Sequence, residues 1–143
     1  MLNHTLAQAA LRTRLATLAG TYDLALENAQ FNPTVGRAYI EEEYTPGTTA
    51  QIGVGPLGTV ETRPLFSVKV HTPEGQGMTA ANTFRDALLA LFPPRLAITL
   101  SDGTPLRVRT DTGPYLGPIK RYKPGWLTSP VAIPLWALTQ NSH

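Results

Sequence analysis

The chain of 143 residues has the usual length of a single domain, enough to bury about two thirds of its unfolded surface in one core. It contains no cysteine, which excludes disulfides and thiolate metal sites. No apolar run approaches the ~20 residues that span a bilayer, so we expect a soluble protein without a membrane partner. The 13 prolines and 12 glycines against 15% charged residues predict many turns, short strands and long loops.

The net charge of +2 is too small to imply nucleic-acid binding by itself, but the charges are unevenly distributed. Residues 1–86 carry six Lys/Arg and eight Asp/Glu, whereas residues 87–143 carry six Lys/Arg and two Asp/Glu. One interpretation is ordinary solvated surface. The other is a pair of complementary faces through which copies of the chain associate.

The first element is predicted to be a helix from about Asn3 to Ala19, rich in Ala, Leu and Arg and closed by Gly20. Its apolar residues fall on two sides of the helix. One side holds Ala7, Leu11, Leu15 and Leu18, and the nearly opposite side holds Leu2, Leu6 and Ala9. Either the first turn is frayed, or the second side packs on a neighbouring subunit.

The next three segments are predicted as a connector, a strand and a loop. Thr21 to Gly36 mixes apolar residues with asparagine and proline, which is typical of an irregular connector. Arg37 to Tyr44 alternates as a strand, and its acidic run, Glu41 to Glu43, is expected to be exposed. Thr45 to Gly58 is glycine-rich and almost uncharged, which predicts a long hairpin loop.

This loop contains Gly53-Val54-Gly55-Pro56-Leu57-Gly58, which has the glycine spacing of a dinucleotide-binding turn. Such a motif should follow a strand directly and open a helix. The residues after it, Thr59 to Phe66, are instead typical of an extended strand. A hairpin tip is therefore the favoured interpretation, and no cofactor is expected.

Pro64 to Phe92 predicts a strand, a glycine turn and a helix. Phe66, Val68 and Val70 share one face of the strand, and the outer face holds Leu65, Ser67, Lys69 and His71. The helix is predicted over about 79–92, with Thr79 as its cap and Pro93-Pro94 as its end. Its buried stripe is predicted to be Ala80, Phe84, Ala87, Leu88 and Leu91.

The remaining third of the chain is predicted to be mostly strands. Residues 96–108 form a hairpin around Asp102-Gly103, with Arg107 and Arg109 on its outer face. Residues 115–122, interrupted by proline, are either a short strand or a bulged loop.

Leu127 to Leu138 is predicted as the last strand, with Val131, Ile133 and Leu135 facing the core. Pro130 and Pro134 share one edge, which predicts a sheet border that is open or covered by another chain. These elements together predict an α+β fold: a mainly antiparallel or mixed twisted sheet with two helices packed on one face, in a single domain over residues 1–143.

Neither catalysis nor metal binding is indicated by the sequence. His4, His71 and His143 lack metal-ligand spacing, and no nucleophile elbow or paired carboxylates are present. A basic and aromatic surface for phosphates or stacked bases remains an alternative. Its members would be Arg107, Arg109, Lys120, Arg121 and Lys123, with Tyr115, Tyr122 and Trp126 among them.

Several segments together resemble a known family. They are the first helix, Leu26-Glu27-Asn28-Ala29-Gln30-Phe31-Asn32-Pro33, the strand-turn-helix from Phe66 to Phe92, and Gly125-Trp126 with Val131-Ala132-Ile133-Pro134. In this order they resemble the tail terminators of long, non-contractile-tailed bacteriophages. The resemblance covers most of the chain.

The resemblance implies a structural virion protein without enzyme activity or cofactor. It implies a homohexameric ring that caps the completed tail tube, ends tube polymerisation and offers its other face to the head-completion (connector) protein. The tail tube protein is then a partner, and phage DNA passes through the channel without specific binding. The expected location is the neck-proximal end of the tail, after assembly in the host cytoplasm.

Under this interpretation we expect regional rather than catalytic sites. The expected subunit or tube interface comprises Leu2, Leu6, Gly53, Gly55, Gly58, Arg107, Arg109 and Arg121, and the residues expected to face the channel are Glu41 and Glu43. A neck or head-tail joining protein is the first alternative. A nucleic-acid-binding accessory module that uses the basic second half of the chain is the other.

Overall fold

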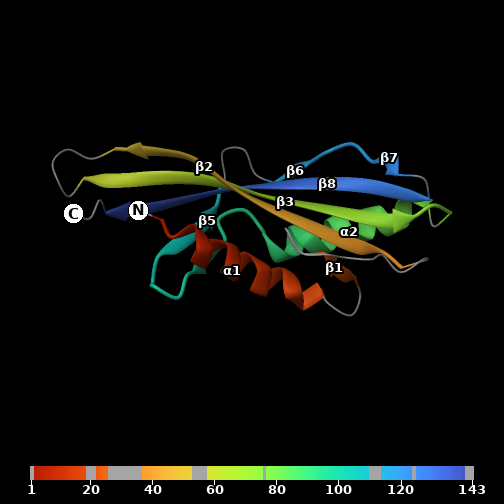
Figure 1. Cartoon of the computed structure of the whole chain (residues 1–143), viewed down its shortest axis with the longest axis horizontal. Helices are drawn as coiled ribbons and strands as arrows, with labels where there is room; N and C mark the ends of the chain where they lie inside the picture. The colour runs from red at the N-terminus through yellow and green to blue at the C-terminus, as the bar shows by residue number, and fades with distance from the viewer. Residues whose placement is uncertain are drawn as a thin grey trace.

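The computed structural model describes residues 2–18, 22–25, 37–52, 58–75, 77–109, 114–123 and 125–140. Within these residues the chain forms a single α+β domain with two α-helices and a mixed eight-stranded sheet (Figure 1). The elements are α1 (His4–Leu15) followed by the 3-10 helix η1 (Ala16–Leu18), β1 (Asp23–Ala25), β2 (Tyr39–Gln51), β3 (Thr59–Pro73), α2 (Gly77–Leu91), β4 (Ala97–Thr99), β5 (Pro105–Val108), β6 (Tyr115–Leu116), β7 (Lys120–Lys123) and β8 (Trp126–Gln140).

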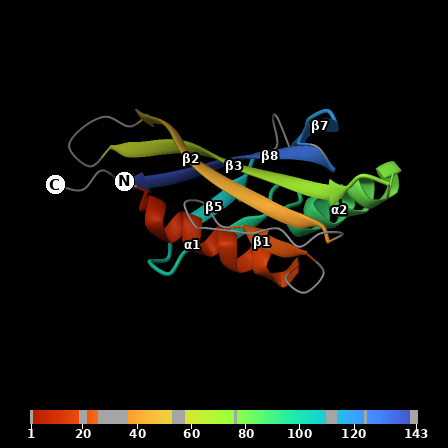
Figure 2. The same cartoon turned by 45° about the vertical axis from the view of Figure 1, so that its right-hand side comes forward.

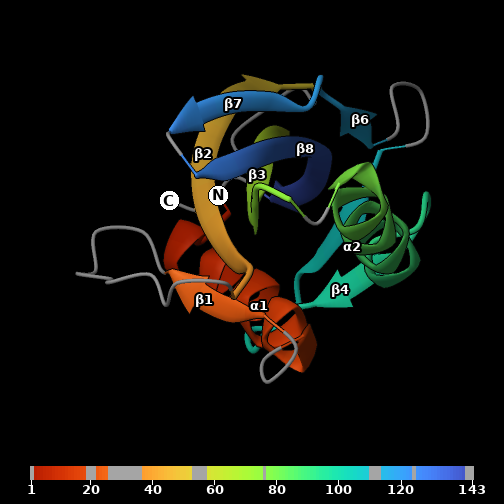
Figure 3. The same ribbon diagram turned by 90° about the vertical axis from the view of Figure 1, so that its right-hand side faces the viewer.

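The sheet has the order β1-β2-β3-β8-β5-β4, and the short strands β6 and β7 also pair with β8. β1 and β2 are parallel, and the other pairs are antiparallel. Figures 2 and 3 show that the sheet is strongly curled. The expected simple layer of two helices on one face of a twisted sheet is not confirmed, because a sheet that curls this strongly presents no flat face.

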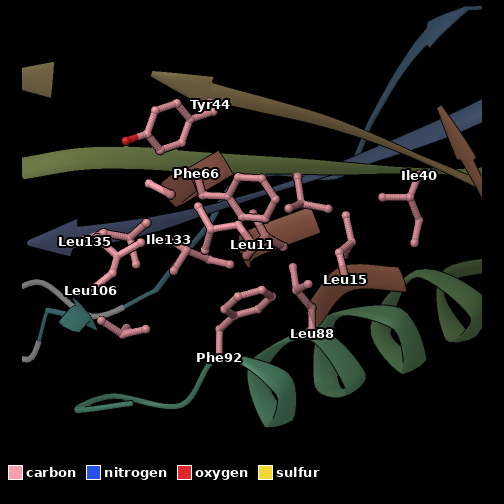
Figure 4. Close-up of a cluster of buried hydrophobic side chains, with 14 of the residues drawn as sticks. Leu11, Leu15, Ile40, Tyr44, Phe66, Leu88, Phe92, Leu106, Ile133 and Leu135 are labelled. Carbon is pink, nitrogen blue, oxygen red and sulfur yellow. The ribbon is translucent and has the colours of Figure 1, made fainter. Parts of the chain in front are cut away.

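One apolar cluster joins both helices to the sheet (Figure 4). The alternation predicted for β3 and β8 is confirmed, because Phe66, Val68, Val70, Val131, Ile133 and Leu135 are all fully buried. Ala7, Leu11 and Leu15 enter the cluster from α1, and Phe84 and Leu88 enter it from α2. The side chains of Phe66 and Phe92 meet with their ring centres 5.9 Å apart.

Helix α1 closely matches the predicted helix. Asn3 caps it by accepting a hydrogen bond from the amide of Leu6 at 3.1 Å. The side of the helix that carries Leu11 faces the core, as predicted. On the other predicted side, Ala9 is exposed and Leu6 is half-buried, but Leu2 is only 4% exposed and belongs to the core cluster. The chain itself therefore covers Leu2.

Helix α2 begins at Gly77, two residues before the predicted cap. Thr79 consequently lies within the first turn and is not the capping residue, a correction to the predicted boundary. Ala81, Phe84 and Leu88 are fully buried, whereas Ala80 is only half-buried. Ala81 lies three residues before Phe84 and therefore on the same side of the helix. The buried stripe thus runs through Ala81 rather than through the predicted Ala80.

Strand β2 is longer than predicted. Residues 45–51, interpreted from their composition as part of a loop, continue the strand and pair with β3 through Gln51 and Val60. A β-bulge between Thr45 and Thr48 accommodates the Pro-Gly pair. Gly47 has φ +72, and a Cβ there would lie 1.9 Å from the carbonyl oxygen of Arg63, so only glycine fits. The bulge explains why turn-forming residues occur inside a strand.

Strand β8 is not a sheet border, contrary to prediction. β3 pairs with one of its edges, and β5, β6 and β7 pair with the other. The carbonyl oxygens of Pro130 and Pro134 accept from the amides of Gly117 at 3.0 Å and Arg109 at 2.9 Å. The missing proline amides therefore interrupt pairing along this edge without leaving it open, which is why several short segments of the same chain cover it.

The connections also differ in part from the prediction. The predicted connector 21–36 includes the parallel strand β1, which its composition does not indicate, and its residues 26–36 lie outside the described part. Residues 115–122 form parts of two short strands, β6 and β7. The predicted hairpin is confirmed as β4 and β5, with Gly103 at φ +90 in the turn.

Candidate interface surfaces

Two polar contacts connect α1 with β2 on the core side of the sheet. Arg12 donates from Nε to Glu42 Oε1 at 2.7 Å, and the Glu42 side chain is only 1% exposed. Nδ1 of His4 lies 2.7 Å from the hydroxyl of Tyr44. Burial raises the pKa of Tyr44 to about 12 and lowers the pKa of His4. Glu42 therefore has a structural role, and the expectation that the whole acidic run is exposed is wrong for this residue.

Glu41 and Glu43 lie on the other face of β2, because successive strand residues point to opposite sides. Oε1 of Glu41 is 2.7 Å from Nε2 of His71, and the Glu41 side chain is 43% exposed. Glu43 is exposed. A position facing the channel stays a prediction for both residues. Of the two carboxylates, Glu41 is held by the contact with His71 and Glu43 is the more exposed.

His71 lies on the outer face of the sheet and is nevertheless buried. The alternating pattern of β3 predicts that residues on this face are exposed. Its Nδ1 lies 2.8 Å from Oγ1 of Thr128, and its ring stacks on Tyr39 with 4.5 Å between centres. Trp126 packs edge-on against Tyr39 at 5.0 Å. Tyr39, His71 and Thr128 face one another across β2, β3 and β8. Such cross-strand neighbours depend on register, which the alternation of a single strand cannot reveal.

The three predicted basic residues are not gathered into one surface. The Arg107 guanidinium lies 5.4 Å from the centre of the Trp136 ring. Arg109 follows β5 and bonds through its backbone to β8. Arg121 lies on β7, where its Nε is 2.5 Å from Oε1 of Glu74. β5 and β7 pair with β8 around residues 136 and 128, which lie about 25 Å apart along an extended strand.

β2, β3 and β8 extend together as a three-stranded segment, residues 45–51, 59–65 and 134–140, called the arm below (Figure 1). One side of the arm still contributes Leu135 and Ala137 to the core cluster. Thr45 to Ala50 are all exposed. At the end of the arm, Ile52 is 58% exposed and Leu138 is 38% exposed. Of the glycines predicted to contribute to an interface, Gly58 is buried, whereas Gly53 and Gly55 lie outside the described residues.

A groove separates α1 and η1 from β4 and has a volume of about 510 Å³. It is called the α1–β4 groove below. Its walls are mainly apolar and small polar side chains, namely Leu6, Ala9, Ala10, Thr13, Arg14, Thr17, Ile98, Thr99 and Ser101. Leu6, predicted to contact a neighbour, thus lines an open groove. Arg14 is held at its margin by donating from Nε to the carbonyl oxygen of Leu91 at 2.5 Å.

The part of the chain that the structure describes contains no cluster of His, Asp and Glu able to hold a metal ion. None of its helices is long and apolar enough to cross a membrane.

Comparison with known proteins identifies the family. The family model described as phage tail terminator protein matches residues 7–135, nearly the whole chain. The chain belongs to the phage tail terminator family. It is therefore a structural component of a virion tail, as the family consists of structural proteins rather than enzymes. No curated protein matches the chain.

A solved structure similar to this tail terminator family member supports the fold. It matches with a TM-score of 0.73 and 26% sequence identity, over 97% of each chain. The name of that protein describes no function, so the likeness adds no information on activity. It does extend over the arm and both helices, because almost the entire chain is aligned.

The groove and the edge of β4 were not identified from the sequence. Ile98 and Thr99 look like ordinary residues of a short hairpin strand. A groove depends on how far α1 lies from β4, and no local pattern encodes that separation. The half-buried Leu6 on the second apolar side of α1 is the one signal that pointed to this surface.

Proposed function

We propose that this protein caps the completed phage tail tube as a hexameric ring, ends tube polymerisation and provides the surface for head attachment. The observation that carries the proposal is the match of residues 7–135 to the tail terminator family. The proposed partners are further copies of the chain, the tail tube protein and the head-completion protein. The ring is assembled in the host cytoplasm and lies at the neck-proximal end of the tail.

The distribution of surfaces supports a ring. A closed ring of more than two identical chains uses heterologous contacts, in which one patch of a chain meets a different patch of the next. The chain has two such dissimilar patches, the projecting arm and the α1–β4 groove. It therefore has the kind of surface pair that ring formation needs.

Negative charge on the channel wall suits the passage of DNA. In the proposed ring, Glu43 faces the channel together with Glu41, whose contact with His71 holds it in place. Because DNA is also negatively charged, such a wall keeps the DNA from adhering during ejection. Arg107, Arg109 and Arg121 then meet the acidic surface of an adjoining ring.

The experiment that tests this function is electron microscopy of tails from a phage that lacks the gene, with and without the purified protein. We expect overlong tails without heads, and tails of fixed length joined to heads once the protein is added. Tails of normal length that fail to join heads would contradict the terminator role and indicate a head-tail joining protein. Salt-sensitive DNA binding by the isolated protein, without an effect on tails, would indicate the nucleic-acid-binding alternative.

A further inference from the structure

The arm exposes one edge of β2. β1 pairs only with residues 39–41, so among the described strands residues 45–50 have β3 as their sole strand neighbour. The amide of Ile52 donates to the carbonyl of Thr59 at 2.8 Å. Because amides alternate between the two edges of a strand, the amide of Ala50 also faces β3 and that of Thr49 faces outward. This outward edge carries no charged side chain from Thr45 to Ala50.

β4 ends the sheet on the opposite side and has the second open edge. Its described strand neighbour is β5 alone. The amide of Val108 donates to Leu96 and the amide of Leu100 donates to Thr104, both at 2.9 Å. By the same alternation, Ala97 and Thr99 direct their backbone groups away from β5. The α1–β4 groove, which Ile98 and Thr99 help to line, lies beside this strand.

Unpaired strand edges bind extended backbone, because only another strand satisfies a row of amides and carbonyls. Exposed edges are protected by charged side chains, by proline or by β-bulges. Thr45 to Ala50 carry no charge, and Pro46 with the bulge between Thr45 and Thr48 interrupts this edge only in part, because the amide of Thr49 faces outward. Apart from Arg14, which donates to the carbonyl oxygen of Leu91, the groove walls are likewise apolar or small and polar. An uncharged strand therefore fits the groove better than a charged one.

We propose that copies of the chain join head to tail by strand addition, with Thr45 to Ala50 of one copy lying along β4 in the α1–β4 groove of the next. The proposal rests on the proposed ring function and specifies how its subunits meet. The contact is heterologous, so it can close into a ring.

Charge complementarity favours a parallel arrangement of the added strand. With Thr45 beside Ala97, the exposed Glu43 of one copy lies beside the exposed Arg95 of the next. An antiparallel arrangement would instead bring Glu43 toward the carboxylate of Asp102 at the far end of β4. The attraction between Glu43 and Arg95 therefore favours the parallel direction of the added strand and the β4 edge as its binding surface.

Cross-linking tests the contact directly, because the chain has no natural cysteine. The variant Thr45→Cys with Ala97→Cys, two positions that the parallel arrangement places side by side, is assembled on tails and treated with a short thiol-to-thiol cross-linker. We expect a ladder of covalent multimers in a denaturing gel. The control, Thr45→Cys with Asp86→Cys, should stay monomeric because the exposed Asp86 does not line the groove. Tails of fixed length without a ladder would overturn strand addition and leave the proposed function intact.

If the proposed capping function itself is wrong, the result is different: tails from a phage that lacks the gene would already have normal length.

Two further comparisons keep the proposal testable if the double-cysteine variant does not assemble. Glu43→Arg and Arg95→Glu should each reduce capping by about tenfold or more, and the double variant should restore it. Failure of the double variant to recover, while it remains folded, would contradict the proposed direction.

A matched pair of proline variants tests the backbone edge itself. Thr49→Pro removes an amide that faces outward, so folding should be unchanged while capping is lost. Ala50→Pro removes an amide that faces β3, so it should lower the unfolding temperature as well. Normal capping by a folded Thr49→Pro protein would overturn the proposal.

Discussion

Around Phe66 the central strands are covered by helices and every second side chain is fully buried, whereas in the arm the continuation of β2 is exposed from Thr45 to Ala50. The two regions share the same strands, β2, β3 and β8. They differ in what covers them, since Leu11, Phe84 and Leu88 belong to the core cluster and Ile52 at the tip of the arm does not.

This difference separates folding from assembly. Burial of large apolar side chains supplies most of the free energy of folding, so the region around Phe66 holds the domain together. The arm buries Val60, Leu135 and Ala137, but it exposes Ile52, Leu138 and the continuation of β2. Substitutions in the first region should therefore lower stability, and substitutions of the exposed arm residues should alter assembly with little effect on stability.

The largest expected effect on stability is that of Phe84→Ala. Phe84 is fully buried and contacts Tyr22 edge-on at 5.2 Å. Removal of the ring leaves a cavity, and we expect the free energy of unfolding to fall by about 3 to 5 kcal/mol in urea denaturation. Ile52→Ala is the control in the arm, with an expected change within about 0.5 kcal/mol. Similar losses for both variants would contradict the separation of the two regions.

Arg12→Ala should have the next largest effect. It leaves the Glu42 carboxylate, 1% exposed, without the guanidinium at 2.7 Å. Complete removal of a partner from a buried pair costs roughly 3 to 5 kcal/mol, but Arg12 is 33% exposed, so we expect about 2 to 3 kcal/mol. Arg12→Ala combined with Glu42→Gln should recover part of the loss, as measured by a double-mutant cycle. Complete additivity of the two single losses would contradict a direct interaction.

The core could be predicted from the sequence because its evidence is local. Alternation around Val68 and Val131 identifies the buried face of each strand, and the spacing of Leu11, Phe84 and Leu88 identifies the helix stripes. Family membership could also be inferred, since it rests on the order of these segments. The helix boundaries were less accurate because several residues near Gly77 can start a helix.

The interface surfaces could be predicted only in part, because they depend on long-range pairing. The Pro46-Gly47 pair resembles a turn, yet the bulge opposite Arg63 keeps both residues in β2. Pro130 and Pro134 suggest an open border, but Gly117 and Arg109, which directly follow β6 and β5, donate to their carbonyl oxygens. Both predictions were wrong because the partner strand, which the local sequence does not specify, determines how these residues are used.

Tyr44→Phe should have a smaller effect that depends on pH. Burial raises the pKa of Tyr44 from 10.0 to about 12, so its contribution to stability is present below pH 10 and is lost as pH rises through 12. At neutral pH, loss of the contact with His4 should cost about 1 kcal/mol. Urea denaturation at pH 8 and pH 11 compares the variant with the wild type.

The expected result is that the free energy of unfolding declines more steeply at alkaline pH for the wild type than for Tyr44→Phe.

The pKa of His4 is lowered by burial, so its contribution to stability has the opposite pH dependence: it is present above the ordinary value of 6.5 and is lost as pH falls. His4→Gln should therefore reduce the loss of stability on acidification. Parallel pH profiles for the wild type and Tyr44→Phe would show that this tyrosine does not titrate differently in the folded protein.

The smallest effect on stability is expected from shortening the tip of the arm. Ile52 and Thr59 are a hydrogen-bonded pair, so residues 53–58 can be replaced by Asn-Gly, which closes a two-residue hairpin. The shorter loop has a lower closure entropy, and the protein should be as stable as the wild type or more stable by about 1 kcal/mol. If this segment reaches a neighbour or the tube, tails should nevertheless remain uncapped and overlong in electron micrographs. Tails of normal length from this stable variant would show that residues 53–58 are not needed for capping. Capping would then be assigned to the rest of the arm.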